Sequence, residues 1–144
     1  MKKTTDSSAP VFSPVLPKVY EYFLAEGWVV MAGKTDQDND LLSLKTAGPN
    51  DWWFHVSAVS GSHVLLRNDE PVIPSKEIIK AAAAVAAYHS KMREGGNVAV
   101  VYTQAKYISK SRGAKPGLVQ LKRQVTINVR PALPPSLNPE SSSI

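Results

Sequence analysis

Two histidines, His55 and His63, are the residues of this chain best suited to proton transfer or metal binding, and both lie in β-rich runs. The runs cover residues 52–57 and 62–67. Side chains alternate along a strand, so a three-residue turn with Gly61 in the left-handed conformation would place His55 opposite His63. A one-residue change of register would separate them. The candidate cluster on this sheet face is His55, His63 and Arg67.

Several roles remain open for these imidazoles. A zinc site would lack a third ligand, because the chain has no cysteine and no His-Glu-x-x-His motif, and we expect no metal and no other cofactor. Imidazoles titrate near neutrality and suit acid–base catalysis, but Ser62 lacks the Gly-x-Ser-x-Gly context of a nucleophile. Histidines bonded to backbone carbonyls in the core are the alternative. An exposed Trp53 beside them would be able to stack on an unpaired base.

A second motif is the loop Lys110-Ser-Arg-Gly-Ala-Lys-Pro-Gly117. Gly113 and Gly117 permit positive φ angles, and exposed backbone N–H groups flanked by three cations would form a phosphate cradle. The Walker pattern is absent, so this is not a nucleotide-binding P-loop. A solvated hairpin turn is the alternative reading. The candidate phosphate-binding residues are Lys106, Lys110, Arg112, Gly113, Lys115 and Gly117.

The positive charge of the chain is confined to its last third. The first 94 residues hold ten Lys and Arg against eleven Asp and Glu, whereas the last fifty hold seven against one, Glu140. One-sided positive charge attracts polyanions and releases their counterions on contact. The seven cations are Lys106, Lys110, Arg112, Lys115, Lys122, Arg123 and Arg130.

The length of 144 residues allows one domain, which we expect to be free-standing and monomeric. Polar, proline-rich composition predicts a disordered arm over residues 1–17 and a disordered tail over 131–144, leaving a folded part over 18–130. We see neither the apolar run of a signal peptide nor a segment of membrane-spanning length. The sequence therefore predicts a cytoplasmic protein without membrane association.

The pattern of elements predicts an α+β fold. Residues 19–24 and 28–32 read as a hairpin, and a short helix is expected within 36–46. The long helix begins after Ser75 and is expected to run to Gly95-Gly96. Four further β-rich runs follow. The order ββαββαβββ(β) predicts a mostly antiparallel sheet with one long covering helix and a short second helix.

An ordered series of motifs resembles a known family, the NFACT-R (NFACT RNA-binding) domain. The series runs through Asn39-Asp-Leu-Leu42, Asp51-Trp-Trp-Phe-His55, Gly61-Ser-His-Val64, Tyr88-His-Ser-Lys91, Val100-Val-Tyr-Thr103 and the loop at 110–117. The similarity spans about residues 18–130. The family is the C-terminal module of fibronectin-binding-like proteins that act in ribosome-associated quality control. The double tryptophan departs from the usual pattern of the family. The helix-hairpin-helix and coiled-coil parts of full-length family members have no room in this chain.

The resemblance implies a non-catalytic RNA-binding domain acting on tRNA or ribosomal RNA. Full-length members bind the large ribosomal subunit and recruit tRNA to extend a stalled chain, and that tail-adding activity is not carried over. We assign phosphate contacts to the cationic loop and a more specific contact to His55, His63 and Arg67. Two alternatives stay open: a protein-interaction module of a quality-control complex, and a His-dependent enzyme that processes RNA or nucleotides.

Overall fold

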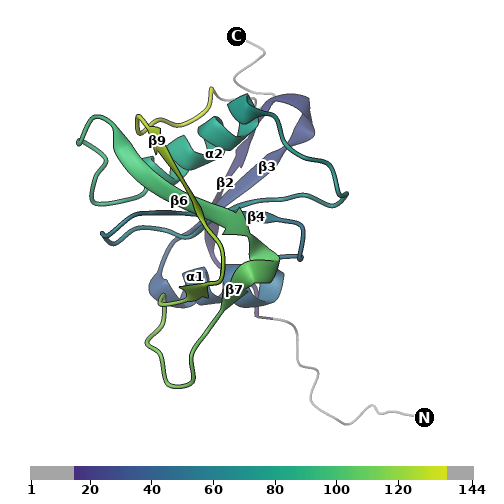
Figure 1. The fold of residues 1–144 in the computed structure, drawn as a ribbon, viewed down its shortest axis with the longest axis vertical. Helices are drawn as coiled ribbons and strands as arrows, with labels where there is room; N and C mark the ends of the chain where they lie inside the picture. The colour runs from purple at the N-terminus through teal and green to yellow at the C-terminus, as the bar shows by residue number, and fades with distance from the viewer. Residues whose placement is uncertain (1–14, 136–144) are drawn as a thin grey trace.

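Six strands form one antiparallel sheet in the computed structural model, which describes residues 15–135 (Figure 1). Every neighbouring pair in this sheet is antiparallel. Their order in space, β2-β3-β5-β4-β6-β9, differs from their order in the chain. The α+β class and the mostly antiparallel sheet are thus confirmed. The strands are β2 (Val19–Phe23), β3 (Val29–Gly33), β4 (Trp52–Val56), β5 (Val64–Leu66), β6 (Val98–Gln104) and β9 (Val125–Val129).

Helix α2 (Lys76–Tyr88) covers one face of the sheet. It begins at Ser75, whose hydroxyl oxygen accepts a hydrogen bond from the Ile78 N–H at 3.2 Å, as the sequence predicts. Its alanine-rich face allows close approach to the strands, and this layer holds the main hydrophobic core. The sheet contributes Val30, Ala32, Phe54, Val56, Val64, Leu66, Val98, Val100 and Val129 to that core.

The helix is shorter than predicted, because it ends at Tyr88 instead of reaching Gly95. His89 leaves the helical conformation at φ −92° and ψ 38°. Its ring stacks on Tyr20 of β2 at 4.7 Å between centroids, and its Nε2 lies 2.6 Å from the Tyr22 hydroxyl. These contacts with a strand distant in sequence hold His89 at the helix end. The predicted long covering helix is therefore a helix of 13 residues.

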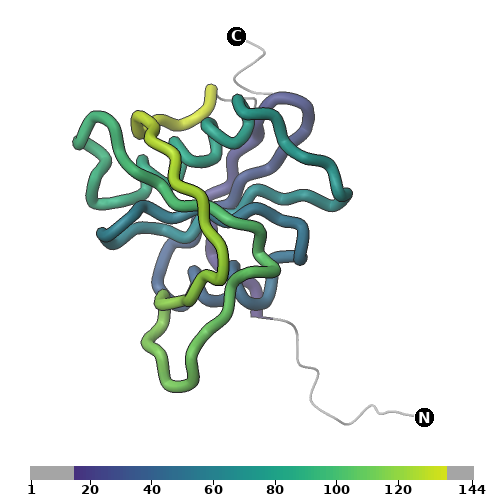
Figure 2. The backbone as a smooth tube through the Cα atoms, viewed as in Figure 1, coloured from purple at the N-terminus to yellow at the C-terminus, as the bar shows by residue number. Residues whose placement is uncertain are grey.

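The opposite face of the sheet carries α1 (Asp36–Leu41) and the π-helical turn η2 (Leu42–Thr46), which together confirm the predicted short helix. Thr35 caps α1 by accepting from the Asp38 N–H at 3.1 Å. Residues 105–124 lie beside these turns and form an excursion between β6 and β9, called here the basic finger (Figure 2). It contains η3 (Ala105–Tyr107) and a separate small sheet of β7 (Ile108–Ser109) and β8 (Gln120–Leu121).

The connections between β2 and β3 and between β4 and β5 place different residues in the left-handed conformation. The first hairpin closes through η1 (Ala25–Gly27), with positive φ at Glu26 and Gly27. In the β4–β5 connection the left-handed residue is Ala58, with φ 66°, and not Gly61 as expected. Gly61 instead forms an isolated bridge with Ser90, and a Cβ on it would lie 2.8 Å from the Ser90 Cβ. Close approach to the end of α2 is what requires glycine there.

Most of the two predicted disordered segments falls outside the described residues, and their disorder stays a prediction. Residues 131–135 have no regular secondary structure, although the Ala132 N–H donates to the Ala84 carbonyl at 3.2 Å. Within residues 15–135, no helix has the length and apolar character needed to span a membrane.

Candidate nucleic-acid interface

His55 and His63 face each other across β4 and β5. Phe54 lies opposite Val64 in this register, and the next pair along the two chains is His55 and His63. Their rings meet edge to face, with centroids 5.4 Å apart. The predicted juxtaposition of the two imidazoles is confirmed, although the turn that produces it is not the one expected.

His63 is buried, and both of its ring nitrogens are hydrogen-bonded. Nε2 lies 3.0 Å from the Gly117 carbonyl oxygen, and Nδ1 lies 2.7 Å from the Ser43 hydroxyl. A carbonyl only accepts, so Nε2 carries the proton, and neutral Nδ1 accepts from Ser43. The Ser43 oxygen in turn accepts from the Trp53 indole N–H at 2.8 Å. Burial, with a smaller contribution from nearby His55, lowers the pKa of His63 to about 4.

This arrangement gives His63 a positioning role. A neutral imidazole with both nitrogens occupied has neither a free lone pair for a metal nor a proton to exchange with a substrate. It connects η2, through Ser43, with the basic finger, through Gly117. Its own backbone N–H donates to the Asn39 side-chain oxygen at 3.0 Å, which ties α1 to the same point.

His55 is half-buried and lines a pocket between the sheet and the basic finger. The pocket has a volume of about 340 Å³, and its finger side is formed by Gly117, Leu118 and Leu121 among others. Burial lowers the pKa of His55, so its imidazole is neutral near pH 7. Trp53 is only 2% exposed, and the expectation of an exposed Trp53 that stacks on a base is wrong. Trp53 instead supports the pocket from below, 5.9 Å from the His55 ring.

Arg67 does not join the imidazoles. It lies four positions after His63, about 13 Å along an extended strand. Its Nε lies 3.0 Å from a carboxylate oxygen of Asp51, a side chain that is almost wholly buried. It lines a different pocket, beside Trp28 and Glu70. The predicted three-residue cluster therefore reduces to the two histidines.

Lys110 closes the base of the basic finger. Its ammonium group lies 3.1 Å from Asp40 of α1 and donates to the carbonyls of Lys115 and Leu118 at 2.7 and 2.9 Å. The Gly117 N–H is also occupied, donating to Asp40 at 3.0 Å. Lys110 and Gly117 thus shape the loop from within. Asp40 was not among the residues singled out for a role, since nothing local in the sequence pairs it with a loop 70 residues away.

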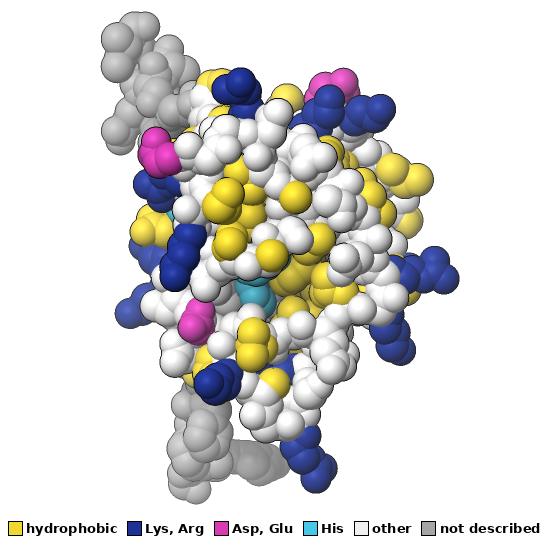
Figure 3. All heavy atoms as spheres, turned by 60° about the vertical axis from the view of Figure 1, so that its left-hand side comes forward, with side chains coloured by type: hydrophobic (Ala, Val, Ile, Leu, Met, Phe, Trp, Pro, Cys, Tyr) yellow, Lys and Arg dark blue, Asp and Glu magenta, His cyan; other side chains and the backbone are white. Residues whose placement is uncertain are grey.

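The other cations of the basic finger point to solvent. Residues 105–124 contain six Lys and Arg and no acidic residue. The cationic groups of Lys106 and Arg123 lie 5.4 and 5.3 Å from the centre of the Tyr107 ring. Figure 3 shows Lys and Arg at the lower end of the molecule and along the edges, around histidine and hydrophobic atoms in the middle of that face. The exposed cations of the finger are Lys106, Arg112, Lys115, Lys122 and Arg123, and Gly113 at its tip has φ 76°.

Metal ligands are not gathered in this region. Across residues 15–135 no group of three or more His, Asp and Glu side chains is arranged to hold a metal ion. The chemistry that this surface offers is that of cations, the aromatic ring of Tyr107, and a pocket lined by two neutral imidazoles, His55 and the fully hydrogen-bonded His63.

Comparison with known proteins supports the motif series. Rqc2 homolog RqcH from Bacillus subtilis is 36% identical over 118 residues, which cover 82% of this chain and 20% of that protein. Coiled-coil domain-containing protein 25 from Bos taurus is 29% identical over 109 residues, covering 73% of this chain and 52% of that protein. This chain thus spans about a fifth of the RqcH proteins that it matches.

A solved structure shares the fold. The C-terminal part of the fibronectin/fibrinogen-binding protein from Streptococcus suis superposes with a TM-score of 0.74 at 34% identity, covering 88% of this chain and 50% of that one. The sequence model of the NFACT protein RNA binding domain matches residues 18–123, which include both histidines and all but one of the seven clustered cations. The chain belongs to the family of NFACT RNA-binding domains.

Proposed function

We propose that this chain binds RNA through the basic finger and does so without catalysing a reaction. The observation that carries the proposal is the charge of residues 105–124. Five exposed cations occupy a protruding segment that has no acidic residue, while Lys110 and Asp40 neutralise one another at its base. Phosphate groups are the ligands that such a one-signed surface attracts.

The role that we assign to each residue in RNA binding follows from whether its polar groups are exposed or already bonded within the fold. Lys106, Arg112 and Lys115 contact phosphates, joined by Lys122 and Arg123, whereas Lys110, Gly113 and Gly117 hold the loop in shape. Tyr107, whose ring lies near the cationic groups of Lys106 and Arg123, provides an aromatic ring on which an unpaired base stacks. His55 supplies the more specific contact, because its pocket of about 340 Å³ opens beside the finger. His63 supports the site from inside the fold, and Arg67 lies outside it.

The similar proteins suggest the cellular process in which the RNA is bound. The name that recurs among them, Rqc2 homolog RqcH, belongs to proteins several times the length of this match. We infer that the RNA is tRNA or ribosomal RNA met in ribosome-associated quality control, with the large ribosomal subunit as the larger partner. In that setting the protein acts in the cytoplasm as a monomer.

Titration of labelled tRNA, and separately of purified large ribosomal subunits, at two salt concentrations tests the proposal. We expect affinity to fall steeply with salt, because each phosphate contact releases about 0.7–0.9 counterion. Affinity that does not change with salt contradicts phosphate binding. Turnover of RNA during the titration, followed on a denaturing gel, contradicts the non-catalytic assignment.

A further inference from the structure

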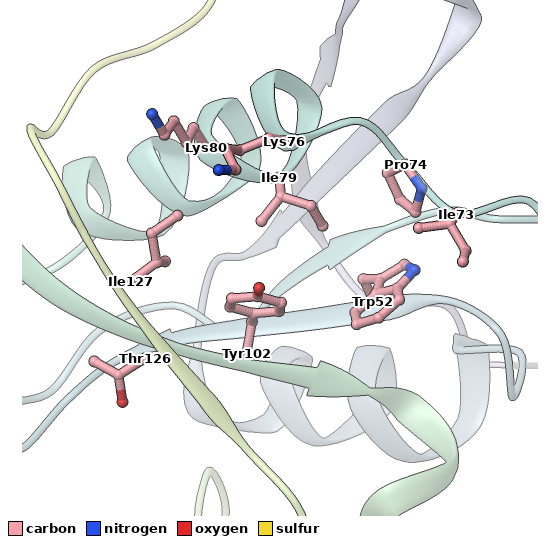
Figure 4. A pocket seen from close by; sticks show the side chains of 9 residues that line it. All are labelled: Trp52, Ile73, Pro74, Lys76, Ile79, Lys80, Tyr102, Thr126 and Ile127. Carbon is pink, nitrogen blue, oxygen red and sulfur yellow. The ribbon is translucent and has the colours of Figure 1, made fainter.

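Another cavity lies under the first half of α2, on the face of the sheet opposite to the His55 pocket. It has a volume of about 520 Å³ and is lined by residues of β4, β6, β9, α2 and the segment before α2. Trp52 and Tyr102 form its floor, with ring centroids 5.9 Å apart and tilted by 54°. Figure 4 shows Ile79 and Ile127 at its sides and Ile73 and Pro74 at one end. This aromatic groove shares no lining residue with the His55 pocket, whereas Trp52 and Tyr102 also line a neighbouring hollow with Tyr107 and Arg123 of the basic finger.

One polar atom at the groove lacks a partner. The Trp52 indole nitrogen is buried and has no hydrogen-bond acceptor among the described residues. A buried N–H without an acceptor destabilises the fold, so a ligand carbonyl oxygen that accepts from this N–H would bind favourably here. Figure 4 shows this nitrogen on the side of Ile73 and Pro74. Ile73 is 85% exposed, so few contacts oppose a small shift of that segment to admit an acceptor.

The rim of the groove is positive. Lys76 and Lys80 lie one turn apart on α2, both are exposed, and both line the groove. None of the residues lining it is acidic. A ligand that places apolar atoms on the floor and carboxylates at the rim would complement both features.

These features fit an extended peptide better than a nucleic acid. A base in this groove would leave most of its polar edge against isoleucine, proline and aromatic carbon, which costs free energy. A polyproline II segment has no internal hydrogen bonds, so its carbonyls are free to accept from an indole N–H. Proline-rich segments of this conformation bind aromatic-lined grooves in other domains.

We propose that the aromatic groove binds an acidic, proline-containing segment of a partner protein. The apolar side chains of the segment pack on Trp52 and Tyr102, a backbone carbonyl accepts from the Trp52 indole N–H, and its carboxylates lie beside Lys76 and Lys80. The proposal does not rest on RNA binding, because none of the residues that line the groove is a cation of the basic finger.

A synthetic peptide of two repeats of Pro-Pro-Leu-Pro-Glu-Glu, added to the full chain, tests the proposal by NMR of the indole N–H groups. We expect one indole resonance, the one missing in Trp52→Phe, to shift on titration. Charge reversal in the double variant K76E/K80E should weaken binding about tenfold, because two attractions become repulsions. The same variant should bind a peptide with lysines in place of the glutamates better than the unmodified chain does.

The matched control is K45E/K91E, which changes the same charge on exposed lysines outside the groove. It should leave peptide affinity within about twofold, as expected for distant surface charges screened by salt. Both double variants keep every cation of the basic finger, so their RNA affinities should stay equal to each other, and a failure of this proposal is distinguishable from a failure of RNA binding.

Three results would overturn the proposal. The first is no shift of the Trp52 resonance at millimolar peptide. The second is a Trp52 shift caused by a uridine oligonucleotide and not by the peptide, which would assign the groove to RNA. The third is a Trp52 shift on deleting residues 136–144, without any response to added peptide, which would assign the groove to this chain's own tail.

Discussion

Lys110 and Asp40 form an ion pair, with Nζ 3.1 Å from a carboxylate oxygen, that joins the basic finger to α1. The same two side chains bond three backbone groups of the loop, the carbonyls of Lys115 and Leu118 and the N–H of Gly117. Loop shape and α1 are thus coupled through two residues 70 positions apart. Lys110 therefore determines how the exposed cations of the loop are positioned for contact with RNA.

The variant Lys110→Ala should destabilise the protein. It removes the ion pair and leaves Asp40 and two carbonyls short of a donor, a loss of about 1–3 kcal/mol in the free energy of unfolding. Urea unfolding measures this loss. Lys122→Ala is the control, because Lys122 is exposed and its removal should change stability by no more than about 0.5 kcal/mol. Equal stability of the two variants would contradict the closing role of Lys110.

The double variant Arg112→Ala/Lys115→Ala should weaken RNA binding and leave the stability nearly unchanged, whereas Lys110→Ala should lower the stability. Both side chains are exposed at the tip of the finger, so stability is expected to change by less than about 0.5 kcal/mol each. RNA affinity should fall, and the slope of log affinity against log salt should become shallower by up to about two. Filter binding of tRNA at several salt concentrations gives that slope.

Removing equal charge elsewhere is the control for this experiment. Lys45→Ala/Lys91→Ala takes two exposed cations from outside the finger. If that variant lowers the slope as much as the finger variant does, RNA binding depends on net charge and not on the finger.

Local patterns predicted the parts of this fold that depend on neighbours in sequence. Alternation along two strands placed His55 opposite His63, and the Ser75 cap marked the start of α2. The one-signed charge of the last third was visible as composition, and the structure places six of its seven cations in one finger. These features follow from periodicity and capping, which act over a few residues.

The features that sequence reasoning missed depend on contacts between distant segments. The end of α2 is set by His89 stacking on Tyr20, 69 positions earlier. Trp53 faces η2, where Ser43 accepts from its indole N–H, whereas Trp52 lies on the groove side. Nothing in the Asp-Trp-Trp-Phe-His run itself distinguishes the two rings, because both faces of the sheet are covered.

The variant Ser43→Ala should lower the stability strongly, although it removes only one hydroxyl group. It leaves the Trp53 indole N–H without an acceptor and His63 Nδ1 without a donor, both buried, for a loss of about 2–4 kcal/mol in urea unfolding. Ser57→Ala, at an exposed serine, should be nearly neutral.

A double-mutant cycle isolates the hydrogen bond from general packing. Trp53→Phe should cost less in the Ser43→Ala background than in the unmodified chain, by about 1 kcal/mol or more, because the unpaired donor is then gone. Strict additivity of the two losses would show that Ser43 and Trp53 are not coupled.

Stability should fall as pH is lowered from 6.5 toward 4. His63 has a folded pKa of about 4 because of burial, against an ordinary value of 6.5, so the unfolded chain takes up the proton first. Protonation of the unfolded state draws the equilibrium toward it, which costs about 3 kcal/mol for this one group by pH 4. Burial lowers the pKa of His55 and His89 as well, which adds losses of the same sign.

Urea unfolding at pH 7.5, 6 and 5 measures this dependence, above the range in which ordinary carboxylates titrate. His63→Asn should lower stability at pH 7.5 but flatten the decline between pH 6.5 and 5, since one proton fewer is taken up on unfolding. In the unmodified chain, the ring proton resonances of His63 should stay constant down to about pH 5. A His63 titration midpoint near 6.5 would mean that the imidazole is solvated, and would remove the basis for its link between η2 and the basic finger.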